Sequence, residues 1–301
     1  MEDTKSHHTC DRIEFLPRLA KLGHPATAAE IATSLQLTER YVQELCNALA
    51  CFELLTYDAA AASYAVPEAT RIVLGSEVNR DTFDGVAQAI HSLHGVADKV
   101  ADSIKGETKG VPFGAFTGIV EAIKGMNQPA IIAGEIFNWT RPLQQQLEQG
   151  IRWVDVGCGS GQFVLQLAQR YADSKFLGID LSIESIAACQ ASLDAISPPL
   201  TNVTFKAIPI EKLDSVSLGG DIDILSTFDV IHDVPGSSAA LKGIYNALKK
   251  GGYYFMVEPK VSSNVEDNIG PRGGFIYSIS LMHCLTQNLA NDGEGLGAGW
   301  A

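Results

Sequence analysis

The sequence lacks several features that define large protein classes. No apolar run reaches the roughly 18–20 residues that a membrane-spanning helix needs. The first ten residues, MEDTKSHHTC, are polar and contain no apolar core, so they do not resemble a signal peptide. The six cysteines form no CxxC pair and no Cys/His cluster with zinc spacing. We therefore expect no membrane insertion, no metal site, and reduced thiols in a cytoplasmic protein.

Basic residues are also scarce. The 301 residues include 22 Lys and Arg against 35 Asp and Glu, which gives a formal net charge of −13. Proteins that bind nucleic acids usually present a basic face, so this balance argues against a polyanionic partner. Hydrophobic residues make up 46% and charged residues 19% of the chain. This composition is typical of a globular protein, and the length is sufficient for two domains.

Residues 1–75 combine helical patterns with two short strands. Thr27 and Glu30 form a capping-box pattern at the start of one helix, and Thr38 occupies the cap position of a second. A first helix is expected over residues 11–22, and the strands over 54–57 and 63–66. Helix, turn, helix and a two-stranded wing together predict an α+β winged-helix domain.

The rest of the chain divides into two further parts. We interpret residues 76–129 as a helical linker and lid, because a helical pattern over 80–103 precedes a glycine-rich segment. Residues 130–301 begin with a helical pattern over 130–148 and then alternate strands with helices. Strands are expected at 151–156, 175–179, 202–206, 222–228 and 252–258, and helices at 161–171, 183–193 and 237–249. This alternation predicts an α/β fold with a Rossmann-like, doubly wound parallel sheet.

The most specific motif is the glycine loop from Asp155 to Gly161, DVGCGSG, which follows a strand and begins a helix. A phosphate-binding P-loop would end in Lys-Ser or Lys-Thr, and a dinucleotide loop would read GxGxxG. Neither pattern is present. Asp155 precedes the glycines and suits a cationic ligand better than a pyrophosphate. S-adenosylmethionine, with its sulfonium and α-amino groups, is such a ligand.

A second acid stands at the end of the next strand. Asp180 follows Gly161 by 19 residues, in the sequence Gly-Ile-Asp. A carboxylate about 20 residues after a glycine loop can accept hydrogen bonds from both ribose hydroxyls of a nucleoside cofactor. Taken singly, the loop and the acid could be no more than a tight turn and a helix-capping Asp. Their combination with Asp155 and the strand–helix alternation favours a cofactor site.

Five motifs together resemble those of class I S-adenosylmethionine-dependent methyltransferases. They are DVGCGSG (155–161), GID (178–180), FDVIHD (228–233), LKKGG (248–252) and VEP (257–259). With the amino-terminal winged helix and the segment 273–297, the chain is similar to small-molecule methyltransferases of bacteria and fungi that carry a winged-helix domain. The resemblance covers about residues 20–301 and specifies the cofactor but no substrate.

The resemblance implies a set of cofactor contacts. The glycines of the loop would contact the methionine moiety, and Asp155 would lie near its amino group. Asp180 would hold the ribose and Leu181 would pack on the adenine. Phe228 and Asp229 would lie under the methionine part. The full set of implied cofactor-binding residues is Asp155, Gly157, Gly159, Gly161, Asp180, Leu181, Phe228 and Asp229.

Two departures from the family pattern bear on activity. The acid that commonly follows the third strand is replaced by residues 207–210, AIPI, so the adenine contact is missing or passes to Glu211. The chain also stops at residue 301, without the helix and two strands that usually end the sheet. The fifth strand would then have an unpaired edge, unless the helical pattern at 273–290 covers it. A shortened protein with little or no activity is the alternative.

Catalysis, if the acceptor is a hydroxyl, would benefit from a general base. His232 follows the fourth strand, in a position that resembles the catalytic histidine of winged-helix-fused O-methyltransferases, and Glu258 at the end of the fifth strand could orient its ring. The following residues 234–236 depart from that pattern, so His232 and Asp233 could instead cap the next helix. A carbon acceptor or an easily deprotonated acid would need no base.

Other histidines have simpler interpretations. His91 and His94 lie three residues apart on a helix but have no visible acid or Cys partner, so a packing or surface role is favoured over metal binding. His283 and Cys284 fall in an apolar helical pattern and are expected in a core, although this helix could line the acceptor pocket.

Three functions remain open at this stage. The first is methylation of a small molecule, most simply at oxygen, by a homodimer joined through the amino-terminal domain. The second is DNA binding by the winged helix, which the six Lys and Arg against ten Asp and Glu in residues 1–75 disfavour. The third is a non-catalytic protein that retains the fold or the cofactor.

Overall fold

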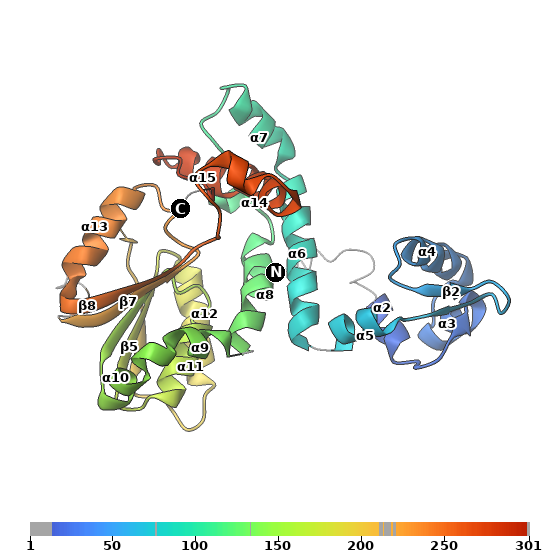
Figure 1. Ribbon diagram of the computed structural model, residues 1–301, viewed down its shortest axis with the longest axis horizontal. Helices are drawn as coiled ribbons and strands as arrows, with labels where there is room; N and C mark the ends of the chain where they lie inside the picture. The colour runs from blue at the N-terminus through green and yellow to red at the C-terminus, as the bar shows by residue number, and fades with distance from the viewer. Residues whose placement is uncertain are drawn as a thin grey trace. The chain divides into compact units, whose positions relative to one another are not determined.

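The computed structural model describes residues 14–299, apart from residues 76, 133, 211–212, 214–217 and 219–220 (Figure 1). Glu211, named above as an alternative adenine contact, lies outside the described residues. The chain forms two compact units. The first contains Met1–Ile90 and Gly118–Ala133, and the second contains His91–Thr117 and Gly134–Ala301.

The winged-helix part of the first unit has short elements in the expected order. These are α2 (Phe15–Ala20), β1 (Ala26–Thr27), α3 (Ala28–Leu35), α4 (Glu39–Cys51), β2 (Thr56–Asp58), β3 (Ser63–Ala65) and α5 (Glu68–Gly75). The three strands form an antiparallel sheet in the order β1-β3-β2. The expected strand pair is therefore present, and the short strand β1 adds to it.

Helix α3 begins as the sequence predicts. The Thr27 hydroxyl accepts a hydrogen bond from the Glu30 amide at 3.3 Å, and the Glu30 carboxylate accepts one from the Thr27 amide at 2.8 Å. Two of the otherwise unpaired amides at the helix start are thus satisfied reciprocally. Thr38 occupies the predicted cap position of α4, and its side chain makes no capping hydrogen bond.

The core of this part is apolar. Phe15, Ile31 and Cys46 are fully buried, and they pack with Val42 and Tyr64 from the second helix and the sheet. Burial of a large apolar side chain contributes about 1.5–3 kcal/mol. The buried helical positions recur at the spacing of one helix face, which is the pattern from which the sequence predicts these helices.

The first unit also contains α6 (Glu77–His94), whose last turn belongs to the second unit, and α8 (Ile119–Ile132). Helix α8 occupies much of the segment that its glycines suggested would be a linker. A Cβ at Gly85 on α6 would lie 2.7 Å from the Met126 amide nitrogen, so the two helices approach as closely as only glycine permits. The glycine content here serves helix packing as well as flexibility.

The second unit is an α/β domain with additional helices. Its helices are α7 (Ala97–Ile104), η1 (Phe113–Ala115), α9 (Glu135–Thr140), η2 (Arg141–Leu143), α10 (Gln144–Gln149), α11 (Gln162–Arg170), α12 (Ile183–Asp194), α13 (Ser237–Ala247), η4 (Val265–Asn268), α14 (Pro271–Met282) and α15 (Cys284–Ala290). Its strands are β4 (Arg152–Val156), β5 (Lys175–Asp180), β6 (Val203–Ala207), β7 (Ile222–Phe228) and β8 (Leu248–Val257).

The five strands form one parallel sheet in the order β6-β5-β4-β7-β8, which confirms the predicted doubly wound fold. Helices α11 and α12 lie on one side of the sheet and α13 on the other (Figure 1). The chain leaves β4 toward β5 and later returns to place β7 on the opposite flank of β4. This reversal is the switch point, where ligands bind beyond the carboxyl ends of the strands.

Three predicted helices are interrupted. The pattern at 130–148 is divided into α9, η2 and α10, because Gly134 adopts a left-handed conformation (φ 75°) and a proline lies in η2. The pattern at 80–103 is divided at residues 95–96. The pattern at 273–290 breaks at His283, whose φ and ψ of −133° and −77° are not helical. Helical periodicity alone does not reveal such breaks.

Strand β8 begins four residues earlier than predicted and the preceding helix ends sooner, because the pairing of Leu248 with Ile222 extends the ladder across a register shift. Within the described part of the chain, β8 pairs with β7 alone and forms the edge of the sheet. Among the described residues, no helix is long and apolar enough to cross a membrane.

Candidate active site

The glycine loop joins β4 to α11 at the carboxyl edge of the sheet. Its backbone is fixed by Ile179, whose carbonyl accepts hydrogen bonds from the amides of Gly157 and Cys158 at 2.8 and 2.9 Å. A Cβ at Gly161 would lie 2.7 Å from the Phe205 ring, so the loop passes too close to β6 for any side chain there. A Cβ at Gly159 would meet nothing within 4 Å. The loop is therefore packed against β6 at Gly161 and open at Gly159, as a cofactor-binding loop must be.

Asp180 ends β5 beside this loop. One of its carboxylate oxygens accepts a hydrogen bond from the Gly159 amide at 2.9 Å, and the other accepts one from the Ser182 amide at 2.9 Å. These bonds fix the side chain at the open part of the loop. The remaining lone pairs of the two oxygens can accept ribose hydroxyls.

The other predicted cofactor contacts lie around the same edge. Leu181 is 72% exposed and free to pack on a ligand. Phe228, at the end of β7, packs edge-on against Phe163 with ring centroids 4.6 Å apart. Asp229 has a positive φ of 59°, which is unusual for a residue other than glycine. Such strain at a strand end is typical of functional sites.

Asp155 is held inside the sheet. It lies opposite Ser226 in the β4–β7 register and is 3% exposed. The Ser226 hydroxyl donates to Asp155 Oδ1 at 2.6 Å, and the indole N–H of Trp153 donates to the Ser226 oxygen at 2.8 Å. Burial raises the pKa of Asp155 to about 7, an effect that the Ser226 hydrogen bond opposes and the charge of Asp180 reinforces.

The loop after β7 touches the glycine loop directly. A Cβ at Gly157 would lie 2.5 Å from a methyl carbon of Val230. Val230 precedes His232 by two residues, so the segment that carries this histidine is in contact with the segment that would hold the cofactor.

His232 and Glu258 form a buried pair at the ends of β7 and β8. The ring of His232 is 2% exposed, and its Nδ1 lies 2.5 Å from Glu258 Oε2. Because a carboxylate only accepts, Nδ1–H is the donor. The other oxygen of Glu258 accepts hydrogen bonds from the amides of Ile231 at 2.8 Å and Val230 at 3.2 Å. Glu258 therefore fixes the ring and the loop that bears it.

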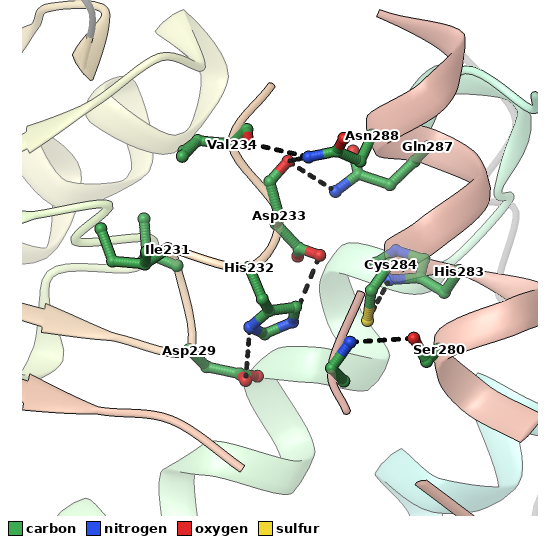
Figure 2. A network of polar contacts seen from close by, with 12 residues as sticks. Asp229, Ile231, His232, Asp233, Val234, Ser280, His283, Cys284, Gln287 and Asn288 are labelled. Carbon is green, nitrogen blue, oxygen red and sulfur yellow. Dashed lines mark hydrogen bonds and ion pairs between the residues drawn. The ribbon is translucent and has the colours of Figure 1, made fainter. Parts of the chain in front are cut away.

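The side of the His232 ring away from Glu258 faces Asp233 and α15 (Figure 2). His232 Nε2 lies 3.3 Å from Asp233 Oδ1, and the ring also bonds with the Cys284 thiol at the start of α15. The Asp233 carbonyl accepts hydrogen bonds from the side-chain amides of Gln287 and Asn288, both at 3.3 Å. Helix α15 thus closes over the histidine.

These neighbours change the charge of His232. Burial alone would lower its pKa, but the hydrogen bonds with Cys284 and Glu258 and the charge of Asp233 outweigh burial and raise the pKa to about 11. In this arrangement the ring is an imidazolium at neutral pH. Asp229 is a further acid nearby, with its Oδ1 3.8 Å from Nδ1.

His283 lies in a different environment. It is 5% exposed, and its ring meets the edges of Phe116 and Phe113 with centroids 4.9 and 6.0 Å apart. Its Nε2 has no hydrogen-bond partner among the residues that the structure describes. Burial lowers the pKa of His283, so this ring is neutral at neutral pH. The expectation that His283 and Cys284 lie in a core is confirmed, and this core borders His232.

Two groups of side chains have the spacing of metal ligands. One is His232 with Asp233 and Cys284, and the other is His232 with Asp229 and Glu258; in each, the donor atoms lie within 4.8 Å of one another. The distances of 2.5 and 3.3 Å from the ring nitrogens to Glu258 and Asp233 are those of ion pairs. Ion pairs with His232 account for the three acids, and Cys284 contacts the same ring through a hydrogen bond.

Sequence reasoning missed Ser226 and the partners of His232 on α15. Ser226 looks like an ordinary strand residue, and only its place opposite Asp155 gives it a role. A predicted parallel register could have suggested it, because buried polar residues on neighbouring strands tend to be paired. No spacing rule links Asp233 to Gln287 and Asn288.

Comparisons with known proteins agree with this geometry. Residues 147–284 match the model of a methyltransferase domain family, and residues 10–75 match the model of the Rv2258c-like winged HTH domain. The ubiquinone biosynthesis O-methyltransferase of Acinetobacter baylyi is 31% identical over 106 residues, which cover 35% of this chain and 42% of that protein. The chain thus spans about two fifths of the length of this curated relative.

Solved structures show the same fold over nearly the whole chain. PigF with S-adenosylhomocysteine has a TM-score of 0.69 at 18% identity, and the match covers 97% of this chain and 84% of that one. Human N-acetylserotonin methyltransferase in complex with S-adenosylmethionine has a TM-score of 0.64 at 17% identity, with 97% and 82% covered.

The predicted class is confirmed. Residues 147–284 match a methyltransferase domain and residues 10–75 a winged HTH domain of the Rv2258c-like kind, and the solved structures share the fold. S-adenosylmethionine or S-adenosylhomocysteine is bound in these two similar structures. The open glycine loop, the fixed carboxylate of Asp180 and the buried carboxylate of Asp155 fit a nucleoside that also carries an ammonium group.

Proposed function

We propose that the chain transfers a methyl group from S-adenosylmethionine to a hydroxyl oxygen of a small molecule. The observation that carries the proposal is the contact at Gly157 and Val230, which joins the open cofactor loop to the loop of the buried His232–Glu258 pair. The name of the Acinetobacter baylyi relative, an O-methyltransferase of ubiquinone biosynthesis, supports oxygen as the acceptor atom.

The cofactor residues have distinct roles in this proposal. Gly157, Gly159 and Gly161 bring backbone close to the methionine part, and Asp155 holds its ammonium group. Asp180 accepts the ribose hydroxyls. Leu181 covers the adenine, while Phe228 and Asp229 lie under the methionine part. The bound cofactor supplies an electrophilic methyl group on a sulfonium. The protein has mainly to align the acceptor with it and to exclude water.

His232 is the proposed general base and Glu258 its positioning residue. His232 Nε2 takes the proton of the acceptor hydroxyl once the acceptor replaces the contacts of this atom with Asp233 and Cys284, and Glu258 stabilises the imidazolium that results. Because its neighbours raise the pKa of His232, the neutral ring is scarce at pH 7. Turnover that depends on this base should therefore increase with pH.

An acidic acceptor offers a second mode of action for the same residue. If the acceptor hydroxyl ionises by itself, the imidazolium of His232 can hold the oxyanion by charge and no base is needed. Turnover should then decrease at high pH, as the ring loses its proton. The pH profile separates the two modes.

Methylation is supported better than DNA binding. The only cation of α4, Arg40, is paired with Glu44 at 2.6 Å, so this helix offers no free basic side chain to a phosphate backbone. We further propose that the protein is a homodimer joined through its amino-terminal domain. The described cysteines, Cys46, Cys51, Cys158, Cys189 and Cys284, are unpaired, which fits a reducing compartment such as the cytoplasm.

The first test is calorimetric titration of the purified protein with S-adenosylmethionine and S-adenosylhomocysteine. We expect binding in the micromolar range, about −8 kcal/mol. Asp180→Ala should abolish it, and Asp58→Ala, an exposed acid of the winged helix, should leave it unchanged. A panel of phenols and other hydroxyl compounds then tests turnover. Binding without turnover on any acceptor would favour a non-catalytic protein, and absence of binding by a folded sample would contradict the proposal.

A further inference from the structure

Asp155 stands out among the predicted cofactor contacts because it is buried with no cation beside it among the described residues. It is 3% exposed, and the groups that shift its pKa are Ser226, which lowers it, and Asp180, which raises it together with burial. The neighbouring thiols of Cys158 and Cys189, on the glycine loop and α12, bear no positive charge. A buried carboxylate in this setting is destabilised until a cationic ligand arrives.

Ser226 is the direct partner of this acid. The β4–β7 register places it opposite Asp155, and the two side chains on the same face of the sheet meet at 2.6 Å. The serine oxygen in turn accepts the indole N–H of Trp153 at 2.8 Å. Because that oxygen accepts from Trp153, its own proton is directed at the carboxylate. All three side chains are at most 3% exposed, so water does not compete.

We propose that Ser226 is a positioning residue of the cofactor site, whose hydroxyl orients Asp155 and favours its ionised form, and that cofactor affinity depends on pH through this pair. The inference rests on the proposed function, since it assumes that Asp155 binds the ammonium group of the cofactor. The chain Trp153–Ser226–Asp155 fixes both the position and the charge of that carboxylate.

The expected effects follow from the ionised fraction of Asp155. The pKa of about 7 means that acidification from pH 8 to pH 6 removes most of the carboxylate, and S-adenosylmethionine affinity should fall about tenfold. Removal of the Ser226 hydrogen bond should move the midpoint of this fall upward by about one pH unit, because a hydrogen bond to a charged group favours that charge.

The experiment combines two measurements on the full chain. The first follows the Asp155 carboxyl carbon by ¹³C NMR against pH in the cofactor-free protein, with the signal assigned from Asp155→Asn. The second measures the calorimetric Kd for S-adenosylmethionine between pH 6 and pH 8.5. Both are made on wild type, Ser226→Ala and Ser226→Thr, which retains the hydroxyl. The ratio of variant to wild-type Kd at each pH cancels the titration of the ligand's own amino group.

Thr227→Val provides a matched control. Thr227 is the next residue on β7, is equally buried, and bonds with the Tyr254 hydroxyl at 2.6 Å instead of Asp155. A second control is the ligand 5′-methylthioadenosine, which lacks the amino-acid part. Its affinity should not change between wild type and Ser226→Ala.

The inference is supported if the NMR midpoint and the Kd midpoint both move upward in Ser226→Ala and return toward wild type in Ser226→Thr. It is overturned if the midpoints stay in place, or if Ser226→Ala and Thr227→Val weaken binding equally at every pH. If the NMR midpoint moves upward in Ser226→Ala as expected but the protein binds no S-adenosylmethionine, the proposed function is rejected, and with it the claim that this pair controls cofactor affinity. An unchanged NMR midpoint with normal binding would reject the inference alone.

Discussion

The winged-helix part and the α/β domain differ in what they bury. In the described winged-helix residues, 14–75, the core is apolar and Ser63 is the only polar residue that is buried. The α/β domain buries Asp155, His232 and His283, and it holds Glu258 with its side chain 8% exposed. The winged-helix part is built for packing, and the α/β domain carries acids and histidines in its interior.

The apolar core of the winged-helix part serves stability, whereas the buried acids and histidines of the α/β domain serve function. Apolar burial stabilises each unit in proportion to its area, whereas a buried ionisable group costs free energy unless it is paired. Asp155 has a hydrogen bond but no counter-ion within the described part of the chain, and His232 is surrounded by acids. Such an arrangement persists where a ligand or a reaction uses it. The two parts should therefore respond differently to substitution.

The largest effect is expected at the buried histidine. His232→Ala should reduce turnover by about 100- to 10,000-fold, the usual contribution of a general base. Cofactor affinity should stay within about twofold, because the residues proposed to contact the cofactor remain. Stopped-time methylation assays and calorimetry measure the two quantities. His24→Ala, at an exposed histidine of the winged helix, is the matched control and should change neither.

The pH profile of wild type sharpens this result. The pKa of His232 in the folded protein is about 11, well above its ordinary value of 6.5. A base must lose that proton, so turnover should rise from pH 7 toward pH 10. An imidazolium that holds an oxyanion would stay protonated over this range and lose activity only as the pH passes about 11. A flat profile, together with full activity of His232→Ala, would show that the ring takes no part.

The second effect concerns the apolar core of the winged helix. Ile31 is fully buried, and Ile31→Ala should destabilise this domain by about 2–5 kcal/mol through lost burial and the cavity left behind. Hydrogen exchange should accelerate in residues 26–66 and stay unchanged in residues 152–180. Cofactor affinity should also be unchanged. A loss of affinity in step with the exchange would show that the two units are energetically coupled.

The third effect is a gain in stability rather than a loss. Asp155→Asn should stabilise the cofactor-free protein at pH 8 by about 2 kcal/mol, because the amide carries no charge to bury. The raised pKa means that the folded state holds a proton more tightly than the unfolded chain. The stability contributed by Asp155 is therefore present near pH 4 and is lost as pH rises toward 7.

Thermal melts of Asp155→Asn and wild type across this range check the linkage. The two proteins should be similar at pH 4.5 and diverge at pH 8, where cofactor binding should also be weaker in the variant. Equal melts at pH 8 would mean that the carboxylate is not penalised. The α/β domain would then lose the feature that distinguishes it from the winged helix.

Much of this organisation could be predicted from local sequence. The glycine loop, the strand–helix alternation and the Thr27 capping box are patterns of neighbouring residues, and each appears where expected. The contact of His232 with Glu258 could also be anticipated, because both follow strands whose carboxyl ends share one edge of a parallel sheet.

What the sequence left open depends on tertiary contacts. The break at His283 brings Cys284 against His232, and no periodicity marks it. The pairing of Asp155 with Ser226 depends on a strand register that spacing does not determine. The charge of His232 depends on neighbours from two loops and a helix. Each of these is a long-range effect, and the site chemistry depends on them.

The smallest effect is expected at the helix caps, where the two parts can be compared most directly. Thr27 caps α3, and Ser182 caps α12 by accepting a hydrogen bond from the Ser185 amide at 3.0 Å. Replacement of either residue by Ala should cost about 1 kcal/mol of stability. Thr27→Ala should leave cofactor affinity unchanged. Ser182→Ala should weaken it about two- to fivefold, because the Ser182 amide also holds Asp180 at 2.9 Å and a loosened helix start lets that acid move. Chemical denaturation and calorimetry measure both quantities. Equal affinities for the two variants would show that Asp180 is held by the glycine loop alone.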